Sequence, residues 1–181
     1  DAAEVKEFLA QGASAHARDD KGVTALIAAA YRNDLAIADL LIQAGADVNA
    51  QDNTKQSAYL IPTAEGHLEL LRHTLQAGAD VNSLDSYNGT GLIRAADRGH
   101  VDIIRELLKS DIKIDHVNRL GWTALLEAII LGDGGTRHTE VVRLLVEAGA
   151  DVNLADGQGV TPLAHAQKRD LSQMVAILKR A

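Results

Sequence analysis

The sequence predicts an all-α solenoid in which short helix-turn-helix units stack side by side. One phrase of the chain, KGVTALIAAAYRNDLAIADLLIQAGADVNAQDN at 21–53, recurs with edits at 54–86, 87–119 and 120–157. One position recurs every 33 residues and, after the fourth copy, at an interval of 38: Thr24, Ser57, Thr90, Thr123 and Thr161. A fixed period between about 20 and 50 residues is the signature of a stacked repeat protein.

Each full copy begins with a turn and a short first helix. Gly22, Gly121 and Gly159 share the aligned turn position, which predicts a positive φ there. The Thr that follows is expected to cap the first helix, and Pro162 fits directly after its cap. The first helices are rich in Ala, which lets neighbouring copies approach closely.

The second helix of each copy is apolar around more than one stripe, as expected for a helix packed between others. Gly45, Gly78 and Gly149 are predicted to end it in the left-handed conformation, and Asp111 is expected to adopt that conformation in the third full copy. The last copy carries Ser172, Gln173 and Lys179 where earlier copies are apolar or packed, which predicts a C-terminal cap facing water.

The blocks TALIAAA (24–30), AGADVN (44–49) and GHxExL from Gly66 resemble ankyrin repeats over essentially the whole chain. The resemblance implies short β-turn or hairpin fingers and protein–protein recognition through finger tips and a concave face. The His of the family's T-P-L-H block is absent from every copy. The predicted organisation is one domain, 1–181, in these units: a partial repeat at 1–20, full repeats at 21–53, 54–86, 87–119 and 120–157, and a capping repeat at 158–181.

Composition excludes several function classes. The net charge is −7, which argues against a nucleic-acid partner, because phosphate binding needs a basic surface. No apolar run is long enough to span a bilayer. Cysteine is absent, which suits the cytoplasm or an oxidising compartment. The chain opens on Asp1 in mid-repeat, so we expect a mature or trimmed product, periplasmic if a signal peptide was removed.

Positions four, seven and eight after each Thr share one face of the first helix. From the third full copy onward they are strongly polar, and with the finger aromatics they form the predicted partner-binding set: Tyr87, Arg94, Asp97, Arg98, Trp122, Glu127 and His165. Arg94 and Glu127 occupy one slot in adjacent repeats, within bridging distance for long side chains. A ladder of solvated ion pairs is the structural alternative. Trp122 has its own alternative, packing against a neighbouring finger.

The fourth full copy carries an insertion, Leu131–Arg137, predicted to lengthen the turn between its two helices. Insertions in repeat proteins form loops, often at functional places. Glycines beside a helix N-terminus offer a weaker alternative, an anion cradle. The loop residues concerned are Gly132, Asp133, Gly134, Gly135 and Arg137.

Three histidines, His67, His100 and His138, occupy one slot in successive second helices. Stacked helices place equivalent atoms roughly 8–10 Å apart, too far for one zinc ion. Capping or inter-repeat hydrogen bonding is therefore predicted, with no metal or cofactor. In the second full copy, Pro62 is predicted to remove a hydrogen bond and bend the first helix.

A non-catalytic, monomeric protein-binding module is the predicted function. A structural spacer or oligomer subunit is the first alternative. An enzyme or small-ligand site using Arg94, Glu127 and His165 is the second, since acid–base groups must lie within hydrogen-bond reach.

Overall fold

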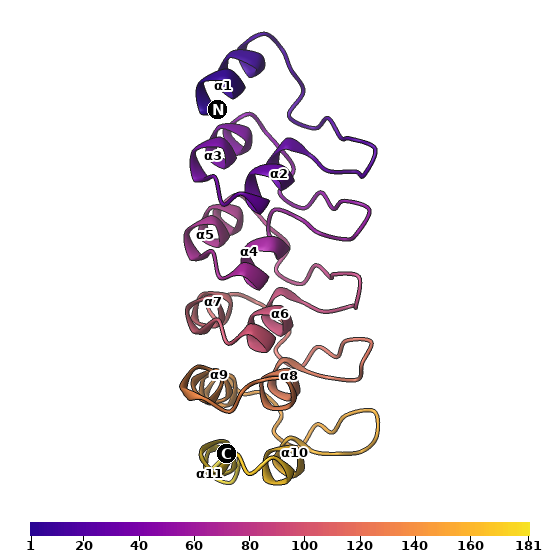
Figure 1. Cartoon of the computed structure of the whole chain (residues 1–181), viewed down its shortest axis with the longest axis vertical. Helices are drawn as coiled ribbons and strands as arrows, with labels where there is room; N and C mark the ends of the chain where they lie inside the picture. Colours follow the sequence, from indigo (N-terminus) through magenta and orange to yellow (C-terminus); the bar gives the residue numbers. More distant parts are fainter.

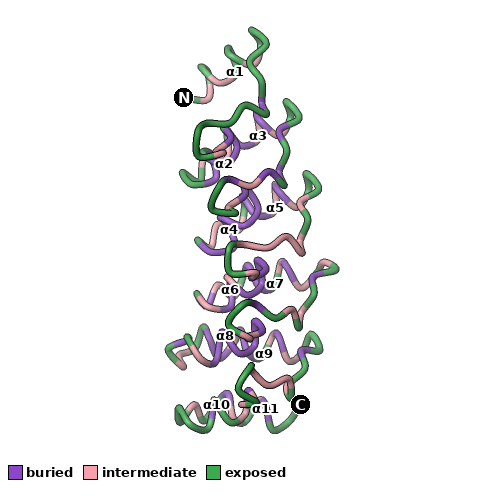
Figure 2. Tube along the Cα trace, turned by 90° about the vertical axis from the view of Figure 1, so that its right-hand side faces the viewer, coloured by how far each residue is buried: buried purple, intermediate pink, exposed green.

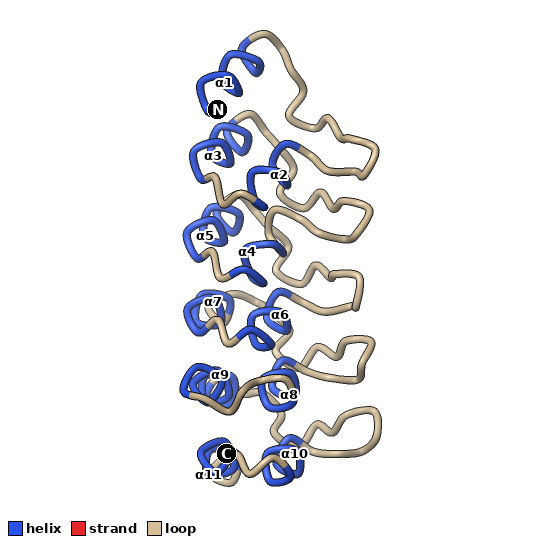
Figure 3. The backbone as a smooth tube through the Cα atoms, viewed as in Figure 1, coloured by secondary structure: helices blue, strands red, loops and turns tan.

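A computed structural model describes all residues 1–181 and shows an all-α solenoid of eleven helices. The helices form two columns, and the loops between repeats project on one side as a row of fingers (Figures 1 and 3). No strand forms; two isolated β-bridges close the first two fingers. None of the helices has the length and apolarity needed to cross a membrane. The predicted fold class is confirmed.

The inner column lies beside the fingers and consists of the first helix of each repeat. Its members are α2 (Ala25–Tyr31), α4 (Leu60–Glu65), α6 (Gly91–Arg98), α8 (Ala124–Ile130) and α10 (Pro162–Lys168). The predicted Thr caps are confirmed: the Thr24 hydroxyl accepts the Ile27 N–H at 3.2 Å, and Thr90, Thr123 and Thr161 act likewise.

The outer column consists of the second helices. Its members are α1 (Ala2–Ala10), α3 (Leu35–Gln43), α5 (Leu68–Gln76), α7 (Val101–Leu107), α9 (Thr136–Glu147) and α11 (Ser172–Leu178). Gly45, Gly78 and Gly149 follow three of these helices with φ of 85°, 88° and 93°, as predicted. A residue with positive φ lets the chain turn away while the last carbonyls stay bonded.

The expectation for Asp111 is wrong, because its φ is not positive. Without a glycine, α7 ends at Leu107 and tightens into bonds from Lys109 N–H to the Glu106 carbonyl and from Ser110 N–H to the Leu107 carbonyl. The Ser110 hydroxyl also donates to the Leu107 carbonyl at 2.6 Å. Hydrogen bonds from an N–H to the carbonyl three residues earlier satisfy the free carbonyls of a helix end without a left-handed residue.

The irregular second full repeat departs from the others in the length of its first helix. Ser57 still caps the turn, since its hydroxyl accepts the Leu60 N–H at 3.0 Å. Pro62 has no N–H to donate to the Ala58 carbonyl, so α4 is regular only from Leu60. The predicted loss of a hydrogen bond therefore appears as a shortened helix.

Tyr59 of the same repeat replaces a core Leu and is fully buried. Its hydroxyl donates to the Val81 carbonyl at 3.0 Å, which satisfies the buried polar group. A Cβ at Gly91 would lie 2.8 Å from the Tyr59 hydroxyl oxygen. The lack of a side chain at Gly91, at the start of α6, therefore leaves the space that the Tyr59 ring occupies.

The hydrophobic core runs along the whole stack between the two columns, and the finger tips are exposed (Figure 2). It comprises two clusters of buried side chains that meet in the second full repeat, where Ile61 and Leu70 belong to one and Leu60 and Leu71 to the other. At the C-terminal end Ser172, Gln173 and Lys179 are exposed, as a cap requires.

Backbone registration between repeats comes from an asparagine at the end of the Asp-Val-Asn segment. The Asn49 amide donates to the Gly78 carbonyl at 3.2 Å and accepts the Asp80 N–H at 2.7 Å. Asn82 makes the same two contacts with Asp111 and Lys113. Asp115 holds this position one repeat later, and it only accepts, from the Asp151 N–H at 2.9 Å.

We predict that Asp115→Asn stabilises the protein by about 0.5–1.5 kcal/mol, because an amide can also donate to the Gly149 carbonyl as the equivalent asparagines do. Urea unfolding followed by circular dichroism measures the change. Asn82→Asp is the matched control and should destabilise by a similar amount. An unchanged unfolding midpoint in both variants would show that these side-chain contacts between repeats do not contribute to stability.

Candidate functional site

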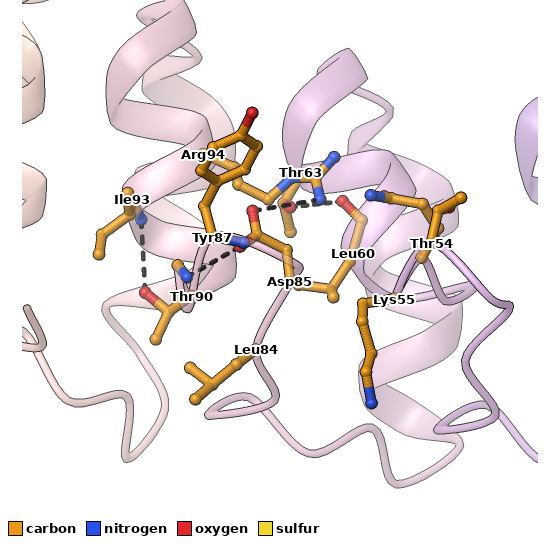
Figure 4. A network of polar contacts seen from close by, with 12 residues as sticks. Thr54, Lys55, Leu60, Thr63, Leu84, Asp85, Tyr87, Thr90, Ile93 and Arg94 are labelled. Carbon is orange, nitrogen blue, oxygen red and sulfur yellow. Dashed lines mark hydrogen bonds and ion pairs between the residues drawn. The ribbon is translucent and has the colours of Figure 1, made fainter. Parts of the chain in front are cut away.

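The first residue of every finger turn uses its side chain to hold the turn closed. Asp85 Oδ1 accepts the N–H groups of Tyr87 and Gly89, each at 2.8 Å, and Figure 4 shows it beside Tyr87. The equivalent residues accept the same two N–H groups of their own fingers: Asp19, Asp52, Asn118 and Asp156. Asp and Asn form such turns because their short polar side chains reach the backbone two residues on.

In three repeats the other side-chain atom of this residue reaches the first helix of the same repeat, nine positions later. Asp85 Oδ2 lies 3.6 Å from Arg94 Nη1. Figure 4 shows the two side chains joined by a dashed line. Asn118 Nδ2 donates to Glu127 Oε1 at 2.7 Å. Asp156 Oδ2 lies 2.7 Å from His165 Nε2. We call these three pairs the finger braces.

The residue types of the finger braces are matched as hydrogen-bond donors and acceptors. Aspartate faces the basic Arg94 and the His165 ring, whereas the amide of Asn118 faces the acidic Glu127. Burial explains the matching, because the Arg94 side chain is 18% exposed and Glu127 is 5% exposed. An unpaired charge at such depth would carry a large desolvation cost.

Two expectations about this row are therefore corrected. Arg94 and Glu127 are not bridged to each other; each is held by the finger of its own repeat. They are also not members of a solvated ladder, because both are largely withdrawn from water. The fingers fold back over the inner helices and supply nearer partners than the next repeat does.

Four of the seven predicted partner-binding residues, Tyr87, Arg94, Asp97 and Glu127, line one pocket of about 380 Å³ between α6, α8 and two fingers. We call it the Glu127 pocket. Its remaining lining residues are Asp85, Gly89, Ile93, Asn118, Leu120 and Leu131. An adjoining hollow of about 280 Å³ shares Tyr87, Arg94 and Asp97 and adds Arg98.

Trp122 and His165 do not belong to this group. Trp122 is half-buried and lines neither hollow. Its backbone N–H donates to the side chain of Asn118 within its own finger. His165 lies one repeat further on and is paired with Asp156. Arg98 stands at the edge, with its Nε 3.4 Å from Asp97 Oδ2.

The buried charges of the Glu127 pocket have shifted titration. Burial raises the pKa of Glu127 to about 7; the Asn118 amide opposes the shift, and the charges of Asp97 and Asp85 add to it. Burial also lowers the pKa of the Arg94 guanidinium, against the attraction of Asp85. Glu127 can therefore exist in both protonation states near neutral pH.

The insertion lengthens the link between α8 and α9, as predicted, but Arg137, which was expected in the loop, lies in the first turn of α9. The loop also does not leave an open anion cradle. The Asp133 carboxylate already accepts the Gly135 N–H at 2.9 Å at the start of α9 and also faces His138 Nδ1 at 2.8 Å. Arg169 of the last repeat donates to the carbonyls of Ile129, Ile130 and Gly132. A fixed negative charge at the helix N-terminus takes the place of an external anion.

The predicted role of the second-helix histidines is confirmed for two of them. His100 Nε2 contacts the Ala64 carbonyl at 2.9 Å, and His138 Nε2 contacts the Asp97 carbonyl at 2.8 Å, in each case in the preceding repeat. His67 makes no such bond, and its Nδ1 is buried without a partner. The rings of His100 and His138 therefore join neighbouring repeats.

Sequence reasoning missed Asp85 and Asn118, which organise the pocket, and the apolar wall formed by Ile93, Leu120 and Leu131. A signal was present, because Asp or Asn recurs at the same finger position in every copy. The partner nine residues away across a turn is not given by helical or strand periodicity.

The family whose sequence model matches is described as ankyrin repeats (3 copies), over residues 1–85, 58–156 and 92–181. A crystal structure of an ankyrin repeat domain from Acinetobacter baumannii AYE has a TM-score of 0.96 and 48% identity, covering 99% of this chain and 91% of that one. The ankyrin repeat protein EF0377 has a TM-score of 0.95 and 36% identity, over 99% and 92% of the two chains.

A third relative is YahD of Escherichia coli (strain K12), which is described as an ankyrin repeat protein. It is 43% identical over 53 residues, which are 29% of this chain and 26% of that protein. This match therefore spans about a quarter of the relative's length.

We predict that Glu127 makes stability fall as the pH rises. Its folded-state pKa of about 7 lies above the ordinary 4.5, so the folded state holds more protons between these values. Relative to Glu127→Gln, the wild type should lose up to about 3 kcal/mol of unfolding free energy across this window. Urea unfolding at a series of pH values tests this prediction. The same pH dependence of the unfolding free energy in both proteins would contradict it.

Proposed function

The chain belongs to the ankyrin-repeat family, and we propose that it is a non-catalytic module that binds a protein partner through the inner face and its finger tips. Ankyrin repeats are in general protein–protein interaction modules. The proposal for this chain concerns the face: the side formed by α2, α4, α6, α8, α10 and the fingers.

The distribution of exposed apolar side chains carries the proposal. Only one large exposed apolar side chain, Phe8, lies on an outer helix. The others belong to fingers or to the ends of inner helices: Tyr31, Tyr87, Val117, Leu120 and Leu131. Aromatic and apolar groups beside buried polar groups are the usual composition of an interface centre.

The finger braces favour binding by a preformed surface. Three fingers are tied to the inner helices by side-chain pairs, and every finger turn is closed by its own Asp or Asn. A surface ordered before association loses little conformational entropy on binding. We therefore expect a rigid scaffold that acts as a monomer.

An enzymatic role for Arg94, Glu127 and His165 has little support from the geometry. Arg94 and Glu127 line one pocket, but His165 lies in the next repeat and is engaged by Asp156. Acid–base chemistry would need such groups to converge on one reacting atom.

Arg94 is also a poor choice for a binding test. Arg94→Glu would bring a second carboxylate against Asp85 and open a finger brace, so loss of binding would not separate a contact from a folding defect. Exposed finger residues without side-chain bonds give a cleaner comparison.

We predict that Tyr87→Ala/Leu120→Ala weakens partner binding at least about tenfold, because truncated aromatic and apolar anchors remove central contacts. These side chains are 64% and 52% exposed, so stability should change little. Capture with the wild-type chain supplies the partner, and calorimetry with the purified partner measures the affinities.

Phe8→Ala is the matched control, since Phe8 is 59% exposed but lies on α1 of the outer column. It should bind as the wild type does. Equal affinity of the double variant and the wild type, or loss of binding in Phe8→Ala alone, would contradict the proposed face.

A further inference from the structure

The charges in the Glu127 pocket are unequal. Its lining carries three carboxyl groups, on Asp85, Asp97 and Glu127, against the single guanidinium of Arg94. Arg94 already faces Asp85 at 3.6 Å, and the Arg98 guanidinium outside the pocket faces Asp97 at 3.4 Å. Glu127 is therefore the one carboxyl group of the pocket with no cationic partner in the protein.

The Glu127 side chain is held in one orientation by neutral donors. Its Oε1 accepts from Asn118 Nδ2 at 2.7 Å. The side-chain oxygen Oδ1 of Asn118 is in turn fixed by the backbone N–H groups of Leu120 and Trp122. The second oxygen, Oε2, has no hydrogen-bond partner in the protein. Oε2 is not among the buried side-chain atoms that lack a partner, so it is accessible from the pocket and has capacity for a ligand group.

The fold does not require an acid at this position. The equivalent residues of two earlier repeats are Ala28 and Ile61, and the chain there forms the same inner helix. Retaining Glu127 has a cost, because burial moves its pKa to about 7. A residue that opposes local stability without a structural need is a candidate for function.

We propose that the Glu127 pocket receives the cationic side chain of a lysine or arginine of the protein partner, with its charged head at Glu127 Oε2. This inference rests on the proposed function, because the cation is a residue of the partner protein. The partner's segment would pass over the finger tips and insert one basic side chain between two fingers.

The walls of the pocket suit the rest of such a side chain. Ile93, Leu120 and Leu131 are apolar and can cover the methylene stem, while the Tyr87 ring stands at the rim. Lysine and arginine bury their stems along apolar surface and keep their heads on polar partners. An aromatic rim adds a cation–π contact.

Other charged groups around Glu127 are engaged elsewhere. On the side of α9, Asp133 is paired with His138, and on the side of α10, His165 is paired with Asp156 while Arg169 donates to carbonyls at the end of α8. The charged groups on the α6 side are Asp85, Arg94, Asp97 and Arg98. None of the cations among them neutralises Glu127, so an entering ammonium or guanidinium group finds an unpaired acid.

Titration with small model compounds tests the pocket directly. N-acetyl-lysine N-methylamide and N-acetyl-arginine N-methylamide are the cationic compounds, and N-acetyl-glutamine N-methylamide is the neutral one. Carbon-13 NMR follows the Glu127 carboxyl and the methyl groups of Ile93, Leu120 and Leu131. The cationic compounds should shift these signals with millimolar affinity, lower the pKa of Glu127, and bind more tightly as the pH rises through about 7.

Glu127→Gln should weaken the cationic compounds about tenfold and leave the neutral compound unaffected, because the amide keeps the Asn118 bond but loses the charge. Glu147→Gln makes the same charge change on the exposed outer surface of α9 and should bind as the wild type does. Equal binding of cationic and neutral compounds, no binding of either, or equal affinities in all three proteins would overturn the proposal.

The purified partner separates this proposal from the proposed function. If the partner needs Tyr87 and Leu120 but binds Glu127→Gln as tightly as the wild type, the cation pocket fails and the proposed function stands. If the model compounds bind at Glu127 while no partner depends on the finger tips, the proposed function fails and the pocket remains a cation site.

Discussion

The two hydrogen bonds that an Asp or Asn side-chain oxygen accepts from backbone N–H groups of its own finger support much of this molecule. They close each finger at the same place, which brings the finger back over the inner helix of its repeat. In three repeats the remaining side-chain atom then meets a residue of that helix. The turn therefore sets both the shape of the inner face and the polarity of what can be buried on it.

The inner face consequently changes character along the stack. In the first two full repeats the positions facing the finger residue are Ala28 and Ile61, which need no partner, whereas the later repeats place Arg94, Glu127 and His165 there. Each of these side chains needs the finger residue of matching chemistry. Buried polar networks are costly when incomplete, and Glu127 differs from the other two in that its Oε2 has no donor in the protein and is accessible from the pocket. That accessible oxygen is what makes it a candidate for recognition.

Stacking itself relies on repeated contacts between neighbouring repeats. Asparagines register the backbone on one side, and His100 and His138 bond to carbonyls of the preceding inner helices. The insertion keeps this scheme, because His138 stays at its carbonyl although α9 begins earlier and the added loop is held by Asp133 and Arg169. The stability of such a protein is approximately a sum over repeats and their interfaces, so a local change such as Asp115 leaves the architecture intact.

The sequence by itself determined the solenoid, the Thr caps, the glycine helix ends, the polar C-terminal cap and the contacts of His100 and His138, because these depend on local backbone conformation or on a period of 33 residues. Tertiary structure decided the partners of Arg94 and Glu127 and the tightened end of α7. It also placed the Asp133 carboxylate at the N-terminus of α9, where an external anion was the alternative. The physical reason is distance across a turn. A residue nine positions away on a folded-back finger lies closer than the same slot of the next repeat, and burial, which sets the charge of Glu127, exists only once the fingers and helices have packed.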